Sequence, residues 1–139
     1  MANPPTIKQI EAAAQKAESA IGALQRKLQA EQREIRRQAF LEDRALTAQE
    51  QQRLADIAAA QQGLTNALVQ LSFVTLQNLD SSAAVQQLQS RMNQINQGLT
   101  GDLDKLKQLE AFAATAAKVA DTVAQVAAKL AALAAGAVI

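Results

Sequence analysis

The last third of the chain keeps one heptad register of apolar residues from residue 85 to residue 137. The register alternates steps of three and four residues and reads Val85, Leu88, Met92, Ile95, Leu99, Asp102, Leu106, Leu109, Ala113, Ala116, Ala120, Val123, Ala127, Leu130, Ala134 and Ala137. Only Asp102 is polar in this series. Residues at this spacing line one face of a helix that packs against other helices. The register therefore predicts an antiparallel bundle of long amphipathic helices with coiled-coil-like packing.

The composition also favours an all-α fold, and it argues against an enzyme. The 139 residues suit a single domain, residues 1–139, and the chain is rich in Ala and Gln. It contains no Cys and no His, which removes thiol chemistry, the commonest general base and the commonest metal ligand. We therefore expect a non-enzymatic protein with no catalytic residues, no metal, no cofactor and no small-molecule substrate.

The first helix is expected over residues 6–45. Its start has two alternatives: Thr6 caps the helix, or Asn3 does, with Pro4 in the first turn. The apolar seam of this helix includes one charged position, Glu31. Arginines and carboxylates alternate around it, which is typical of a solvated, salt-bridged face. The position of Glu31 on the seam also allows a buried or inter-chain pair with an arginine.

The second helix is expected over residues 48–79, because Thr47 and Glu50 form a capping-box pattern. A second apolar stripe contains Val69, Phe73 and Leu76. A helix that is apolar on two sides is usually central in a bundle or covered by another subunit. Polar residues also occupy core positions of the predicted seams, namely Gln61, Thr75, Asn78 and Asp102. These residues either fix the register of the bundle or lie at its wet edge.

The third helix is expected over residues 82–136, capped by one of Asp80, Ser81 and Ser82. The segment Gly98–Gly101 allows two alternatives. Its two glycines favour a reversal that would give a fourth helix, whereas the unbroken register favours one long helix with a kink. A continuous helix would be ~80 Å long at 1.5 Å per residue and would extend beyond the first two helices. Its overhanging end would then need another chain, a membrane or another partner.

The C-terminal helix is rich in Ala and carries an additional apolar row. Small residues let helices approach closely. Three environments are consistent with this helix: the core of the chain's own bundle, an interface between copies of the chain, and contact with lipid. We predict Val119, Val126, Leu130 and Leu133 as residues of a chain–chain interface.

Charge places limits on the partners. The net charge is only +1, so no strong global field attracts nucleic acid or an acidic membrane. The basic cluster of Arg26, Lys27 and the arginines at 33, 36 and 37 is diluted by Glu31 and Glu34. This mixture, with few aromatic residues, argues against nucleic-acid binding.

The sequence therefore predicts a helical interaction or structural protein that self-assembles, or docks a protein partner, through its Ala-rich C-terminal helix. The alternative is a soluble helical protein that binds or inserts into a membrane or another apolar surface, of the granule-coating or pore-forming type. The first residues lack the basic segment and apolar core of a secretory signal. We expect a cytoplasmic protein, and export without a cleavable signal stays open.

Overall fold

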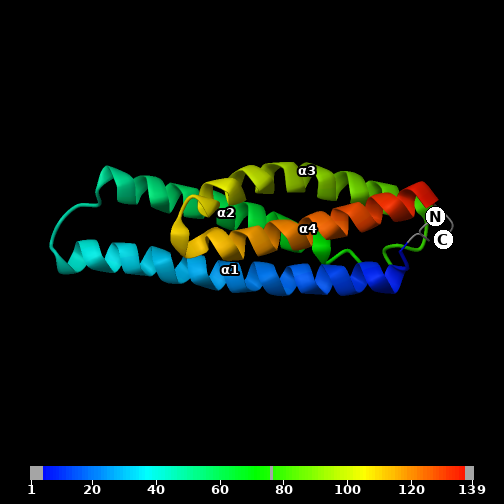
Figure 1. The fold of residues 1–139 in the computed structure, drawn as a ribbon, viewed down its shortest axis with the longest axis horizontal. Helices are drawn as coiled ribbons and strands as arrows, with labels where there is room; N and C mark the ends of the chain where they lie inside the picture. The colour runs from blue at the N-terminus through cyan, green and yellow to red at the C-terminus, as the bar shows by residue number, and fades with distance from the viewer. Residues whose placement is uncertain (1–4, 76, 137–139) are drawn as a thin grey trace.

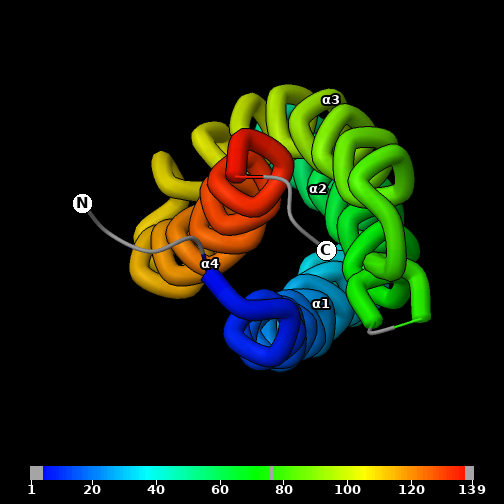
Figure 2. Tube along the Cα trace, turned by 90° about the vertical axis from the view of Figure 1, so that its right-hand side faces the viewer, coloured from blue at the N-terminus to red at the C-terminus, as the bar shows by residue number. Residues whose placement is uncertain are grey.

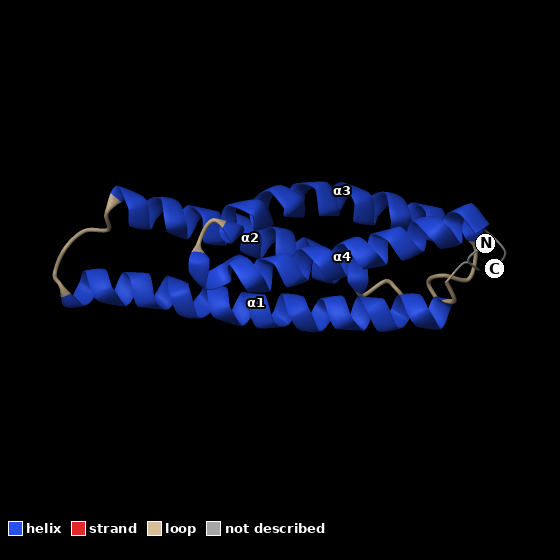
Figure 3. Cartoon of the chain, in the orientation of Figure 1, coloured by secondary structure: helices blue, strands red, loops and turns tan. Residues whose placement is uncertain are grey.

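The chain folds into four helices joined by three short connections. The structure is a computed structural model that describes residues 5–75 and 77–136. The helices are α1 (Ile7–Leu41), α2 (Ala48–Leu71), α3 (Ser82–Lys107) and α4 (Glu110–Gly136), and no strand occurs in the described ranges (Figures 1 and 3). The predicted all-α bundle is confirmed, in its four-helix form.

Successive helices run antiparallel and form a ring around one apolar core. Each helix packs along two neighbours, so that α1 contacts α2 and α4, and α3 also contacts α2 and α4. Figure 2 shows this ring from one end of the bundle. The start of α1 and the end of α4 lie at the same end (Figure 1). Every helix therefore has two sides covered by the chain itself over most of the bundle.

The chain reverses at a place that neither sequence alternative named. The predicted helix 82–136 is two helices, and the reversal lies at Gln108–Leu109 rather than at Gly98–Gly101. Helix α3 runs unbroken through both glycines, which lie on its solvent side. A glycine there costs about 1 kcal/mol relative to Ala, and the buried Leu99, Leu103 and Leu106 hold the helix together across them.

The reversal gives little signal in the sequence because its backbone stays close to helical. Gln108 has φ −72° and ψ −19°, a conformation open to any residue. The N–H of Leu109 donates to the carbonyl of Leu106 at 3.0 Å, and the N–H of Phe112 donates to the carbonyl of Leu109 at 2.9 Å. Because the connection is only two residues long and Leu109 faces the core from it, the heptad register continues across a change of direction.

Helix α2 ends at Leu71, eight residues earlier than the predicted end at residue 79. The residues that follow are Ser72, Phe73, Val74 and Thr75, a run with low helix propensity. Ser72 Oγ donates to the carbonyl of Val69, and tighter turn bonds replace the helical ones after that point. Val74 and Leu79 are buried in this connection and pack in the core.

The starts of α1, α2 and α3 agree with the sequence predictions, whereas α4 starts at Glu110, which neither alternative named. Thr6 and Gln9 form a capping box at α1, and Thr47 and Glu50 form another at α2. Ser81 caps α3 by accepting from the N–H of Ala84 at 3.1 Å. The alternative cap Asn3 lies outside the described residues. Helix α1 ends at Leu41 rather than near residue 45, because Asp43 adopts a left-handed conformation with φ 49°.

Candidate interaction site

The four predicted interface residues lie inside the chain's own core. Val119, Val126, Leu130 and Leu133 are all buried among the four helices. The second apolar row, which begins at Phe112, and the register that contains Ala116 and Leu130 are both turned inward. The closed bundle thus satisfies the first of the three environments that the sequence allowed for α4. In this fold the four side chains are not accessible to a second chain.

The overhang belongs to a different part of the chain from the one expected, to α1 and α2 rather than to the C-terminal helix. Helix α1 has 35 residues, whereas α3 has 26 and α4 has 27. The hairpin of α1 and α2 consequently extends past the turn between α3 and α4, on the left in Figure 1. We call this part, residues 36–52, the hairpin end. Helices α3 and α4 do not cover it, so only two helices shield its apolar side chains.

Two large apolar residues are exposed on the hairpin end. Phe40 is 83% exposed and Leu41 is 63% exposed, although both are the last residues of a regular helix. Their neighbour Ala39 is buried. A Phe and a Leu side by side in water are unfavourable by roughly 25 cal/mol for each Å² of apolar surface. Such a patch is typical of a surface that contacts a partner.

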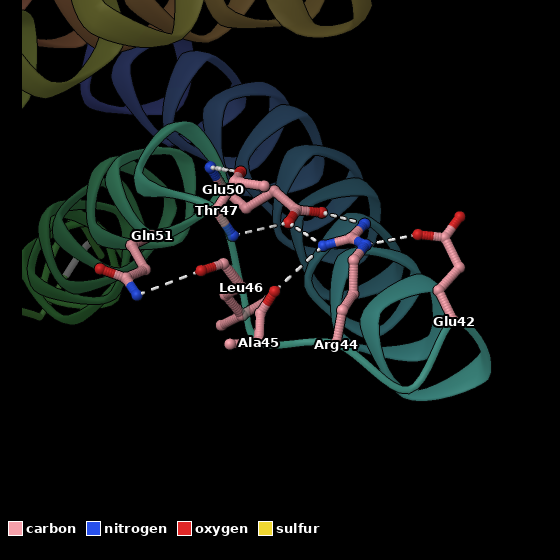
Figure 4. Close-up of polar contacts among 7 residues, drawn as sticks. All are labelled: Glu42, Arg44, Ala45, Leu46, Thr47, Glu50 and Gln51. Atoms are coloured by element: carbon pink, nitrogen blue, oxygen red, sulfur yellow. Dashed lines mark hydrogen bonds and ion pairs between the residues drawn. The ribbon is translucent and has the colours of Figure 1, made fainter.

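The connection beside this patch is held by a clamp of polar contacts centred on Arg44 (Figure 4). The guanidinium of Arg44 pairs with Glu42 on one side, and on the other it contacts both carboxylate oxygens of Glu50, at 2.7 and 3.3 Å. It also donates to the carbonyl of Ala45 at 3.2 Å. The exposed Phe40 and Leu41 are therefore presented on an ordered end, which reduces the entropy lost on binding.

The clamp also changes the acidity of Glu50. Hydrogen bonds from Arg44, and then from the backbone N–H of Thr47, lower the pKa of Glu50 from 4.5 to about 2. Both groups bind the charged form of the carboxylate and so favour it. Glu50 thus remains ionised at any pH above the acidic range, and one side chain serves both the helix cap and the clamp.

A polar junction separates the hairpin end from the four-helix section. Glu31 Oε1 and Arg53 Nη2 form a half-buried ion pair at 2.7 Å between α1 and α2. The arginine partner predicted for Glu31 therefore comes from the same chain. A surface pocket of about 430 Å³ opens beside this pair, between Ile35 of α1 and Leu109 of the α3–α4 turn. Polar contacts thus lie beside the core where α3 ends and α4 begins.

A second exposed apolar pair lies at the far end of α2. Val69 is 49% exposed and Phe73 is 42% exposed, so the predicted second stripe is only partly covered. Its third member, Leu76, lies outside the described residues. Phe73 lines a small surface pocket with Leu88 and Arg91. This pair is smaller and less exposed than Phe40 and Leu41, and it serves as a reference for them.

The polar residues at predicted core positions lie at the edges of the bundle. Gln61 is half-buried and accepts a hydrogen bond from Gln32 at 3.1 Å. Thr75 is half-buried and Asn78 is exposed in the connection that follows α2. Asp102 is half-buried between α2 and α3. Their positions fit the wet-edge alternative, because water reaches each of them.

Neither known proteins nor a metal site or a membrane span identifies a function for this geometry. No protein-family model, curated protein or solved structure matches the chain. Within residues 5–75 and 77–136, no group of three or more acidic side chains is placed to hold a metal ion. Among the described helices, α4 alone is long and apolar enough to cross a membrane, a test that core helices of other bundles also pass.

Proposed function

We propose that this chain is a non-enzymatic helical interaction protein that self-assembles through its hairpin end. The exposure of Phe40 and Leu41 on an ordered helix end is the observation that carries this proposal. The original expectation placed the contact on α4, whose apolar face is occupied by the chain's own core. The hairpin end is the part where only two helices shield apolar side chains, and a second copy would supply the missing neighbours.

The charges around Phe40 and Leu41 favour a second copy of the chain over a partner whose surface carries charge of a single sign. The hairpin end and the turn before it carry arginines and carboxylates side by side: Arg33, Glu34, Arg36, Arg37, Glu42, Asp43 and Arg44. A two-fold contact places the same surface on both sides, so a patch with both signs can complement itself. Antiparallel packing of two α1 ends would set arginines of one copy against the acidic turn of the other.

The test is the oligomeric state of the full chain, measured by analytical ultracentrifugation over a wide concentration range. We expect wild-type protein to associate, and we expect the double variant Phe40→Ser with Leu41→Ser to remain monomeric. Both side chains are exposed, so the variant should keep its helical circular dichroism. The matched control is Val69→Ser with Phe73→Ser, which should associate like the wild type.

Two results would overturn self-assembly through the hairpin end. One is a wild-type monomer at the highest concentration reached. The other is an equal loss of association in both double variants, which would show that exposed apolar area in general, rather than the hairpin end, drives the contact.

A second candidate function is attachment to a membrane by opening of the bundle. The observation that favours it is the apolar character and length of α4. Opening would expose the inward face that contains Val119 and Leu130 to lipid, while Lys118 and Lys129 would stay at the interface. Hydrogen exchange of α4 amides, measured with and without vesicles, tests this. Unchanged exchange in α4 and no flotation of the protein with vesicles would exclude it.

A further inference from the structure

A groove between α1 and α4 differs from the hairpin end in its chemistry. It has a volume of about 430 Å³, and small side chains line it, Ala20 and Ala23 from α1 and Ala114 from α4. Methyl groups leave open space between the two helices where longer side chains would fill it. The groove lies in the four-helix section, so the fold supports it from both sides.

Two lysines line the groove, one from each helix. Lys16 of α1 and Lys118 of α4 are both exposed. The ion pairs found among the described residues use Arg37, Arg44, Arg53 and Lys107 as their cations. Within the same residues, neither groove lysine has a carboxylate partner, and no carboxylate lines the groove. Two positive charges thus face a common space without an opposite charge between them.

Hydroxyl groups add neutral donors to the same space. Ser19 and Thr115 also line the groove. A third lysine, Lys27, donates to Thr115 Oγ1 at 3.4 Å and to the carbonyl of Ala111 at 3.2 Å. Because Thr115 accepts from a cation, its own O–H proton is left available to another acceptor. The groove therefore offers two ammonium groups and two hydroxyls to an incoming ligand.

The neighbouring grooves of the bundle do not share this charge pattern. The groove between α2 and α3 contains the carboxylate of Asp102 and no cation. The pocket at the polar junction contains Glu50 and Asp56 as well as Arg53. A smaller groove further along α1 and α4 again contains a lysine, Lys129, and no acid. The pocket beside Phe73 contains one cation, Arg91, and no acid. Among these pockets, the groove that contains Lys16 and Lys118 is lined by two cations and no carboxylate.

We propose that the groove between α1 and α4 binds a phosphate group, which Lys16 and Lys118 contact from opposite sides. Lysine ammonium groups are common phosphate ligands, and charge-assisted hydrogen bonds are about twice as strong as neutral ones. The phosphate can belong to a free solute or to a lipid headgroup, and the chemistry of recognition is the same. This site is independent of self-assembly, because it shares no residue with the hairpin end.

The first test uses inorganic phosphate and the full chain. We add phosphate in place of chloride at constant ionic strength and follow the backbone amides by NMR. We expect the amide signals of residues 16–23 and 114–118 to shift. Lys16→Gln with Lys118→Gln should weaken phosphate binding about tenfold or more, because both charged donors are lost. The control Lys105→Gln with Lys107→Gln removes the same charge from the end of α3 and should bind like the wild type.

A charge-preserving variant and a vesicle arm complete the test. Ala23→Leu should block the groove without altering any charge, and Ala23 is exposed, so the fold should persist. Flotation with phosphatidylglycerol vesicles, compared with binding of inorganic phosphate, distinguishes a lipid headgroup from a free solute. The site is supported if either probe binds and if both the Lys16/Lys118 variant and Ala23→Leu weaken that binding. The absence of binding to both probes would overturn it. Equal weakening by the two lysine variants would overturn it too, because net charge alone would then explain the binding.

Discussion

The four-helix section and the hairpin end share α1 and α2, yet the two regions bury their side chains very differently. In the four-helix section, α1 contributes fully buried residues such as Ile21, Leu24 and Leu28. Beyond the turn between α3 and α4, the same helix ends with Phe40 and Leu41 in water. The number of neighbouring helices changes at that point, from two per helix to one.

Polar contacts link α1 and α2 where α3 and α4 no longer pack against them. The ion pair between Glu31 and Arg53 and the clamp around Arg44 both lie at or beyond the junction. Such exposed or half-exposed pairs contribute little to stability because water screens them, whereas a buried Leu contributes several kcal/mol. The four-helix section should therefore determine global stability, while substitutions of exposed residues at the hairpin end should change it little.

The largest expected effect concerns a leucine in each region. Leu130→Ala, in the four-helix section, should lower the free energy of unfolding by about 2 to 5 kcal/mol, since the side chain is 0% exposed. Leu41→Ala, at the hairpin end, should change it by less than ~0.5 kcal/mol. Urea unfolding followed by circular dichroism measures both. Similar losses in the two variants would contradict the difference between the regions.

The next effect concerns the cap of α2, which belongs to the hairpin end. Thr47→Ala removes the side-chain oxygen that accepts from the N–H of Glu50 at 3.1 Å. We expect a loss of about 1 kcal/mol in the free energy of unfolding. Thr6→Ala removes the equivalent cap of α1 and is the matched variant. If Thr47→Ala has no effect while Thr6→Ala does, the hairpin end unfolds separately before the rest.

A gain of stability is expected in the four-helix section. A Cβ added at Gly98 meets no atom within 4 Å, so Gly98→Ala should raise the free energy of unfolding by up to about 1 kcal/mol. At Gly63 the added Cβ would lie 3.0 Å from Asp102 Oδ2 and 3.1 Å from Leu99 Cδ1. Gly63→Ala should therefore gain less or lose stability, and the same urea measurement ranks the two. A larger gain at Gly63 would show that α2 and α3 can separate there.

The smallest effect is a pH dependence that originates at the hairpin end. The pKa of Glu50 is lowered in the fold to about 2 from 4.5. Its contribution to stability is therefore complete above pH 4.5 and is lost as the pH falls toward 2. Glu50→Gln should flatten the decline in thermal stability over that interval. Above it, the thermal stability of the variant should differ from that of the wild type by a constant amount. An identical decline in the variant would exclude Glu50 as a source.

Several features could be read directly from the amino-acid order because they depend on local chemistry. The cap at Thr47 was predicted, and Thr6 and Ser81 were each among the predicted alternatives, since a side-chain oxygen in the right place satisfies backbone amides of the same helix. The apolar periodicity likewise predicted the helices. The end of α2 was missed, although the run from Ser72 to Thr75 contained a usable signal in its β-branched and aromatic residues.

The candidate site was much less predictable. The apolar row of α4 is an interface only if a long third helix lacks a neighbour, and this depends on where the chain turns. Gln108 and Leu109 reverse the chain with ordinary backbone angles, so no glycine, proline or asparagine marks the place. Phe40 and Leu41 lie off the apolar seam of α1, which the sequence shows, but whether another helix covers them depends on the lengths of α3 and α4.

The helical class, the caps of α1, α2 and α3, and the inward-facing stripes follow from interactions within a few residues, and the sequence is sufficient for these. Which stripe is covered and which is left in water depends on contacts between residues far apart in the chain. A two-residue reversal after Lys107 folds the long register back on itself, buries Val119 and Leu130, and shortens the bundle. The hairpin of α1 and α2 is thereby left uncovered at its end.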